Sequence, residues 1–304
     1  MYTTIGYPES VALPDGGFLL KSPAKINLFL KILGKRSDNF HELDTLFQEI
    51  DLCDEIEFHA ANELQFSVTG ADVGPDEDNL VVRAARLLSE YANVPCRARI
   101  MLRKHIPTGG GLGGGSSNAS ITLHGLCRLW DLEIEWETLQ ELAAQLGSDC
   151  PFFVFGGMAR GRGRGEKLEI FDGASQGTVV AVLPGFGVNT KKAFQECEFD
   201  LTEHNKNVIF TAYPGDIQGV RYALKNGVND LENIVLRIHP VLQEIRDSLS
   251  SLGADVSLLS GSGSTVFGVF TESTVAGHAA QRLRERFAVY ICRMVGRQRC
   301  AELR

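Results

Sequence analysis

Residues 106–120 read IPTGGGLGGGSSNAS, and this stretch decides the fold. Six of these residues are glycine, which lets a ligand approach the main chain because it has no Cβ and tolerates a positive φ. Beyond the glycines, Leu123, Leu126 and Trp130 recur at three- and four-residue spacing, which predicts a helix beginning near residues 116–117. The free N–H groups and the positive end of that helix dipole would face the glycines. The stretch therefore predicts a phosphate-binding loop.

The glycine pattern has three competing interpretations. Gly109, Gly111 and Gly114 satisfy the dinucleotide pattern G-x-G-x-x-G. However, Pro107 interrupts the strand that such a loop requires, and Asp131 ends the predicted helix rather than the next strand. A P-loop requires a lysine before serine or threonine, and the stretch contains no lysine. A flexible Gly/Ser linker does not usually lead straight into an amphipathic helix.

The composition is that of a soluble globular protein. With 304 residues and 44% hydrophobic content, the chain can bury a large core, and its length favours two domains over one. No apolar run approaches the roughly 20 residues that cross a bilayer. The first 21 residues lack the charge pattern of a signal or transit peptide. We therefore expect a cytoplasmic protein with no membrane partner.

Charge and ligand spacing exclude further classes of protein. The formal net charge of -8 argues against a broad nucleic-acid surface, so no nucleic-acid partner is expected. Seven cysteines and seven histidines are scattered without C-x-x-C or H-E-x-x-H spacing, which argues against a protein-ligated transition metal. The basic run at residues 160–164 is interpreted as a solvated turn between a strand near residues 152–155 and another near residues 167–171.

Hydrophobic periodicity predicts an α+β protein in two parts. Residues 22–58 are rich in strand patterns, and helices are expected over residues 79–92, 138–146, 239–252 and 275–287. Further strands are expected over residues 97–102, 179–183 and 266–270. Residues 172–177 read as a linker. We therefore place an N-terminal domain with the glycine loop at residues 1–172 and a C-terminal α+β domain at residues 173–304.

Three motifs resemble those of the GHMP kinases, in the same order. They are SPAKINLFL at residues 22–30, the glycine loop, and SGSGSTVFGVF at residues 260–270. The resemblance implies a two-domain α+β GHMP kinase fold with the active site in the interdomain cleft, and ATP with Mg²⁺ as phosphoryl donor. Four more segments are similar to the branch of the family that phosphorylates a cytidine-diphosphate sugar alcohol on the non-mevalonate route to isoprenoids. They are residues 36–48, 77–88, 146–153 and 229–232.

The resemblance implies roles for individual residues. Asp149 matches the catalytic aspartate of the family, which would accept the proton of the acceptor hydroxyl. Lys25 matches the lysine that would stabilise the charge of that carboxylate and of the transferring group. On residue type alone, Asp149 also suits a turn and Lys25 a solvated strand position. The positions that match the ATP site are Asn79, Lys104, Pro107, Gly109, Gly110, Gly111, Gly113, Gly114, Gly115, Ser116 and Ser117.

The positions that match the acceptor site are Asn27, Phe40, His41, Thr190 and Phe194. Phe40 and Phe194 would stack on the two faces of cytosine, and His41 would read its polar edge. The usual role of a phenylalanine is nevertheless core packing. This chain has Asn39-Phe40-His41 where Gly-Tyr-His is commoner in the family, so the stacking face is kept and the phenolic hydroxyl is lost.

Other functions compete with this one. A mevalonate- or homoserine-type kinase would not need the cytosine-site residues. A non-catalytic GHMP-like sugar sensor would not need Lys25, Asp149 and an intact glycine loop, all of which are present. A dinucleotide-dependent dehydrogenase is a more distant alternative. The sequence leaves open whether the protein is a monomer or a homodimer, which residues ligate the metal, and what residues 1–21 do.

Overall fold

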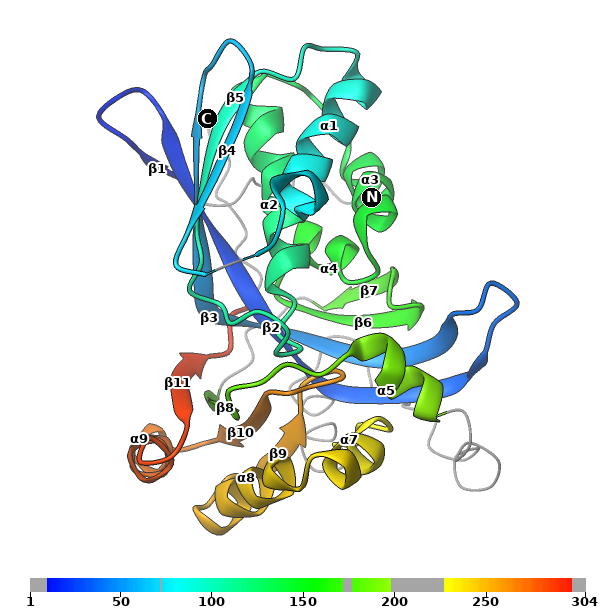
Figure 1. The fold of residues 1–304 in the computed structure, drawn as a ribbon, viewed down its shortest axis with the longest axis vertical. Helices are drawn as coiled ribbons and strands as arrows, with labels where there is room; N and C mark the ends of the chain where they lie inside the picture. Colours follow the sequence, from blue (N-terminus) through cyan, green and yellow to red (C-terminus); the bar gives the residue numbers. More distant parts are fainter. Residues whose placement is uncertain (1–9, 72, 172–176, 198–226, 297–304) are drawn as a thin grey trace.

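The computed structural model describes residues 10–71, 73–171, 177–197 and 227–296. Two β-sheets, each covered by helices, form a larger and a smaller part that lie against each other (Figure 1). The α+β architecture predicted from the sequence is confirmed. The predicted domain boundary falls in residues 172–176, outside the described residues, and stays a prediction.

The larger part is built on two long antiparallel strands, β2 (Phe18–Lys35) and β3 (His41–His59). Among the described residues their sheet has seven strands, ordered β1-β2-β3-β5-β4, with β6 paired to β3 and β7 to β6. The other strands are β1 (Ser10–Ala12), β4 (Leu64–Thr69), β5 (Ala98–Arg103), β6 (Met158–Gly163) and β7 (Lys167–Phe171). The middle of β2 is buried on both faces, and it carries buried polar side chains, among them Lys25 and Asn27, between its apolar residues.

Helices cover one face of this sheet (Figure 1). They are α1 (Leu80–Ala92), α2 (Gly114–Leu129), α3 (Trp136–Leu146) and α4 (Cys150–Phe155), and a 3-10 turn at Asp76–Asp78 precedes α1. Helix α2 packs on β2 and β3 and also contacts α1, α3 and α4. Residues 117–127 of α2 are consequently all buried, as expected for a helix enclosed on all sides. No helix of the described ranges, α2 included, is long and apolar enough to cross a membrane.

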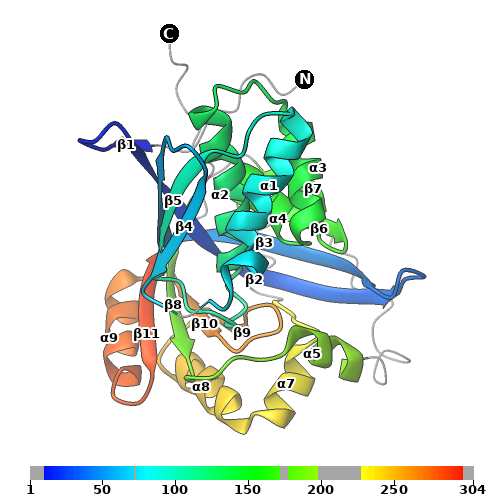
Figure 2. The ribbon, with the colours of Figure 1, turned by 45° about the horizontal axis from the view of Figure 1, so that its top comes forward.

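The smaller part is an antiparallel sheet with helices on its outer face (Figure 2). Its described strands run in the order β11-β8-β10-β9 and are β8 (Thr178–Leu183), β9 (Val256–Leu259), β10 (Val266–Phe270) and β11 (Ala288–Arg293). The helices are α7 (Glu232–Ile238), α8 (Pro240–Ser251) and α9 (Ser273–Leu283). Helix α5 (Thr190–Cys197) follows β8 and lies between the two parts, next to α7 (Figures 1 and 2).

A shared apolar cluster joins the two parts. Ala24, Ile26 and Leu28 of β2 belong to the same buried cluster as Phe267 of β10 and Met294. Burial of such side chains contributes about 25 cal/mol per Å² of apolar surface. The strand that carries the SPAKINLFL motif is therefore held from both sides.

Two sequence predictions are wrong. Residues 152–155 form helix α4 instead of a strand, because a short apolar run does not distinguish a buried helix from a buried strand, and Pro151 stands in the first helical turn. The basic run is not a solvated turn, because residues 160–163 lie in β6 and Arg160 is buried. Arg160 donates to both carboxylate oxygens of Asp44, each at 2.7 Å. Of the arginines in the run, Arg164 alone stands in the β6–β7 turn.

Candidate active site

Strand β2 places Lys25 and Asn27 on the same face, because side chains alternate along a strand. Both residues are buried, and Lys25 Nζ donates to Asn27 Oδ1 at 2.6 Å. Asn27 Nδ2 donates in turn to Thr45 Oγ1 at 2.8 Å, and Thr45 Oγ1 donates to the carbonyl oxygen of Phe29 at 2.8 Å. This chain of bonds fixes the ammonium group of Lys25 in one position. Sequence reasoning missed Thr45, which contributes from the neighbouring strand β3.

Asp149 lies at the start of α4 and faces Lys25. Its Oδ2 is 3.4 Å from Lys25 Nζ, and about a third of its side chain is exposed. The start of α4 is held by α2, since Ser120 Oγ donates to the carbonyl oxygen of Cys150 at 2.6 Å. The carboxylate is thus rigidly mounted, paired with a buried cation, and open to a ligand on its other side. The structure brings together Lys25, Asn27 and Asp149 as the sequence predicted.

The glycine loop runs directly into helix α2. Gly109, Gly111 and Gly113 have φ values of +70°, +76° and +70°, which L-residues with a Cβ rarely adopt. The left-handed Gly113 is the N-cap, and Ser117 N–H donates the first helical hydrogen bond to its carbonyl at 2.9 Å. The helix therefore begins at Gly114, two to three residues before the predicted start. The main-chain N–H groups of residues 114–116 precede that first bond and are available to an anion.

A second Gly/Ser loop at residues 260–265 clamps the first. A Cβ built on Gly111 would lie 2.1 Å from the carbonyl oxygen of Ser260, so only glycine fits this contact. Ser260 Oγ donates to the carbonyl oxygen of Gly111 at 2.9 Å, and Thr265 N–H donates to that of Gly110 at 3.1 Å. The third motif of the sequence is therefore structural support for the first loop from the smaller part.

Two cavities meet at the glycine loop. The smaller cavity, of about 510 Å³, is lined by Asn79, Lys104, Pro107, the six loop glycines, Ser116 and Asn118, among others. The larger cavity, of about 1020 Å³, is lined by Lys25, Asn27, Asp149, Phe40, His41, Thr190 and Phe194, among others. Gly111 and Gly113 line both. Every predicted site residue except Ser117 thus lines one of two adjoining spaces.

Ser117 does not line the cavity in which the sequence predicted it. Its side chain is fully buried, and its Oγ lies 2.8 Å from Ser22 Oγ, which also donates to Asn118 Oδ1 at 2.7 Å. Ser117 therefore ties α2 to β2 and does not face the smaller cavity. A residue one position further along a helix points about 100° away from its neighbour, which is why Ser116 lines the cavity and Ser117 does not.

Two residues that line the smaller cavity have hydrogen-bond or ion-pair partners within the protein. Asn79 Oδ1 accepts from Val81 N–H at 3.0 Å and so caps α1. Lys104 Nζ forms a buried ion pair with Asp54, whose Oδ1 also accepts from the N–H groups of His105 and Ile106 at 2.7 and 2.8 Å. Asp54 is fully buried and shapes the chain that enters the glycine loop. The sequence reasoning missed Asp54.

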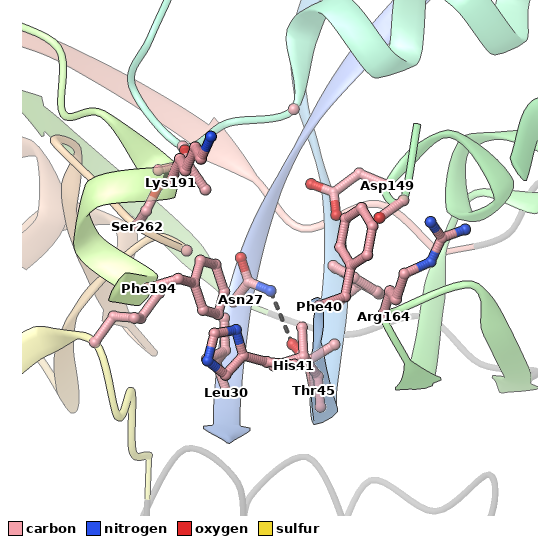
Figure 3. A pocket seen from close by; sticks show the side chains of 18 of the residues that line it. Asn27, Leu30, Phe40, His41, Thr45, Asp149, Arg164, Lys191, Phe194 and Ser262 are labelled. Atoms are coloured by element: carbon pink, nitrogen blue, oxygen red, sulfur yellow. Dashed lines mark hydrogen bonds between the residues drawn. The ribbon is translucent and has the colours of Figure 1, made fainter. Parts of the chain in front are cut away.

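The aromatic residues are arranged differently from the predicted sandwich. The rings of His41 and Phe194 stack on each other with centroids 5.2 Å apart and an interplanar angle of 25°. Phe40 is 48% exposed and lies on the opposite side of the larger cavity from Phe194 (Figure 3). One face of Phe194 is therefore covered by His41. Thr190 Oγ1, at the start of α5, is 2.7 Å from Ser262 Oγ in the second Gly/Ser loop.

Glu49 is a half-buried carboxyl on β3, opposite Lys25 in the β2–β3 register. Burial raises the pKa of Glu49 to about 7, although the N–H of Gly157 donates to its Oε2 at 2.6 Å and acts in the other direction. Its protonation therefore changes near neutral pH.

Comparison with known proteins agrees with this arrangement. The family description "GHMP kinases N terminal domain" matches residues 79–157, and "GHMP kinases C terminal" matches residues 213–289. A 4-diphosphocytidyl-2-C-methyl-D-erythritol kinase from Syntrophus aciditrophicus is 41% identical over 85% of this chain and 91% of its own length. The kinase of the same name from Bacillus subtilis is 38% identical over 92% of this chain and 98% of its own.

The chain belongs to the 4-diphosphocytidyl-2-C-methyl-D-erythritol kinase family. A crystal structure of 4-(cytidine 5'-diphospho)-2C-methyl-D-erythritol kinase superposes with a TM-score of 0.78 at 33% identity, over 91% of this chain and 99% of that one. The GHMP resemblance and the two-domain α+β GHMP kinase fold are therefore confirmed. Homoserine kinase from Cytophaga hutchinsonii, with a TM-score of 0.71 at 16% identity over 95% of this chain and 98% of its own, shares the fold alone.

Proposed function

We propose that this protein transfers the γ-phosphoryl group of ATP to the 2-hydroxyl of 4-diphosphocytidyl-2-C-methyl-D-erythritol, a step of non-mevalonate isoprenoid precursor synthesis. The observation that carries the proposal is the position of Lys25 and Asp149, 3.4 Å apart, in the larger cavity beside the glycines that line both cavities. A donor in the smaller cavity and an acceptor in the larger one would meet there.

Asp149 is the base in this proposal. Its carboxylate accepts the proton of the acceptor hydroxyl as the oxygen attacks the γ-phosphorus, and the bond from that phosphorus to the β-bridging oxygen breaks. Lys25 is fixed by Asn27 and neutralises charge beside the transferring group. Phosphoryl transfer relies mainly on positioning and charge stabilisation, and both are supplied by buried side chains on β2 and α4.

The nucleotide is assigned to the smaller cavity. The N–H groups of residues 114–116 and the dipole of the sixteen-residue α2 favour the phosphates. Mg²⁺ prefers oxygen ligands and binds through one or two protein groups together with phosphates. The hydroxyl of Ser116, which lines the smaller cavity, fits that role. When bound, the ion would neutralise developing phosphate charge.

The acceptor is assigned to the larger cavity, with its nucleobase at the aromatic residues and its reacting hydroxyl at Asp149. Asn27 and Thr190 line the same cavity and supply polar contacts. The His41–Phe194 stack offers its open faces and edges to a flat base. The competing mevalonate- and homoserine-type activities leave these aromatic residues without a role. We also propose that the reaction takes place in the cytoplasm, because both substrates are water-soluble.

Acceptor-dependent release of ADP tests this proposal. Purified protein with ATP and Mg²⁺ is assayed by a coupled ADP assay with and without the cytidyl acceptor, and with mevalonate, homoserine and galactose as controls. We expect rapid ADP release with the cytidyl acceptor and background rates with the others. Equal rates of ADP release with homoserine or mevalonate would show that the proposed acceptor is wrong.

A further inference from the structure

The larger cavity is cationic although the chain as a whole is acidic. Among the described residues, its lining contains Lys25, Lys35, Arg164 and Lys191 and a single carboxylate, that of Asp149, while the formal net charge of the chain is -8. Lys25 is paired with Asp149, so the described lining supplies no further carboxylate for Arg164 and Lys191. A cavity with this balance concentrates anionic ligands.

We propose that Arg164 and Lys191 bind the diphosphate of the acceptor, so that this chain recognises the linker as well as the base. The inference rests on the proposed function, because only an acceptor with a diphosphate between base and sugar alcohol needs such a site. Neither residue was among the positions that the family resemblance singled out, and the sequence alone suggested a solvated turn for Arg164.

The β6–β7 turn is shaped to present Arg164. Gly163 and Gly165 flank it with φ values of +73° and +110°, and Arg162 accepts from the N–H of Gly165 at 3.1 Å. The carboxylate of Glu166 accepts from the main-chain N–H of Arg164 at 2.5 Å. The two glycines allow a tight turn that other residues would strain. The turn is therefore fixed by its main chain and by Glu166, which leaves the Arg164 side chain free to reach the cavity.

Phe40 holds the guanidinium of Arg164 without using its donors. The guanidinium carbon lies 4.7 Å from the centroid of the Phe40 ring, and Figure 3 shows both side chains on the Asp149 side of the cavity. A guanidinium held over a ring keeps its N–H groups available, and these match a phosphate in a two-bonded geometry. The absent phenolic hydroxyl at Phe40 does not affect this contact, since the ring face makes it.

No carboxylate of the described residues forms an ion pair with Arg164 or Lys191. The positive charge of Arg164 helps to lower the pKa of Asp38. The carboxylate oxygens of Asp38 nevertheless accept hydrogen bonds from other groups, namely Arg36 Nε at 3.1 and 3.2 Å and the N–H of Phe40 at 3.1 Å. Lys191 is exposed at the start of α5. Unpaired cations that line one cavity are poised for a ligand anion.

The position of these cations agrees with the covalent order of the acceptor. Figure 3 shows Lys191, Ser262 and Phe194 on one side of the cavity and Arg164, Phe40 and Asp149 on the other. An acceptor with its base near Phe194 and its hydroxyl near Asp149 carries its diphosphate across the space between them. Arg164 and Lys191 then approach the diphosphate from opposite walls.

Binding of CDP and of cytidine separates this linker contact from base recognition. Isothermal titration calorimetry is performed on the full chain saturated with Mg²⁺ and a non-hydrolysable ATP analogue, so that the smaller cavity is filled. The variants are Arg164→Gln and Lys191→Gln. Matched controls are Arg162→Gln, in the same basic run but paired with the exposed Glu169, and Lys192→Gln, next to Lys191 but paired with Glu196.

We expect the wild type to bind CDP more tightly than cytidine. Arg164→Gln should weaken the affinity for CDP about tenfold, equivalent to about 1.4 kcal/mol, and Lys191→Gln should weaken it somewhat less. The affinity for cytidine should change less than twofold in both variants. Both controls should match the wild type. An unchanged CDP-to-cytidine affinity ratio in both variants overturns the inference and leaves the proposed function standing. A wild type that binds neither ligand overturns the proposed acceptor, and the inference with it.

Discussion

Replacement of Gly111 by alanine tests how the two Gly/Ser loops close the site. Gly111 has a φ of +76°, and its new Cβ would lie 2.1 Å from the carbonyl oxygen of Ser260. The left-handed conformation costs alanine about 1–2 kcal/mol. In addition, the Ser260 oxygen has to retreat to at least 3.0 Å, the shortest distance that real Cβ atoms show.

That retreat also weakens the two hydrogen bonds that join the loops, at 2.9 and 3.1 Å. Each contributes about 1 kcal/mol. The expected loss in the free energy of unfolding is therefore about 3–4 kcal/mol, the sum of backbone strain and two broken bonds. Because Gly111 lines both cavities, the KM values for ATP and for the acceptor should rise together.

Urea denaturation of wild type, Gly111→Ala and Gly277→Ala measures this effect. Gly277 in α9 has no atom within 4 Å of a built Cβ, so its replacement should stabilise the protein by about 0.5–1 kcal/mol through helix propensity. A Gly111→Ala protein with wild-type stability and wild-type KM values would refute the clamp between the loops.

Three further predictions concern the site and its surroundings. Because burial raises the pKa of Glu49 from 4.5 to about 7, the folded protein keeps a proton that the unfolded chain releases, and stability falls as pH rises from 4.5 to 7. Glu49→Gln should abolish this fall and be more stable than wild type at pH 8 by on the order of 2–3 kcal/mol; parallel melting profiles from pH 5 to 8 would contradict this. Asn27→Ala removes the 2.6 Å partner of Lys25 and should lower kcat by about 10–100-fold, corresponding to one charged hydrogen bond, with little change in ATP affinity; an unchanged kcat in steady-state assays would argue against positioning by Asn27. Phe194→Ala should raise the acceptor KM, since stacking on a base contributes about 1–3 kcal/mol, and Phe40→Ala should raise it by releasing the guanidinium of Arg164, while the ATP KM stays constant in both; equal effects on both KM values would point to general disruption of the site.

The glycine loop and its helix could be predicted because their physics is local. Positive φ values at Gly109, Gly111 and Gly113 need glycine, and the apolar spacing of α2 follows from its burial. The contact between Lys25 and Asp149 is different, since 124 residues separate them in the sequence. Only the motif resemblance placed them together.

The wrong predictions and the missed residue also have physical causes. Residues 152–155 are apolar whichever regular structure buries them, so periodicity could not distinguish helix from strand. Arg160 and Arg164 have the same composition around them, yet one meets Asp44 across the sheet and the other faces the larger cavity. The buried carboxylate of Asp54 was missed because its partners, Lys104 and two main-chain N–H groups, come from the distant segment that follows β5.

Transfer of labelled γ-phosphate from ATP to the cytidyl acceptor, measured for wild type and Asp149→Asn, tests the central claim most directly. The two side chains are nearly equal in size, so the variant keeps the cavity and removes the base. We predict labelled acceptor with the wild type, and a kcat lower by about two to four orders of magnitude with Asp149→Asn at unchanged ATP affinity. A purified Asp149→Asn protein with near wild-type kcat would contradict the account.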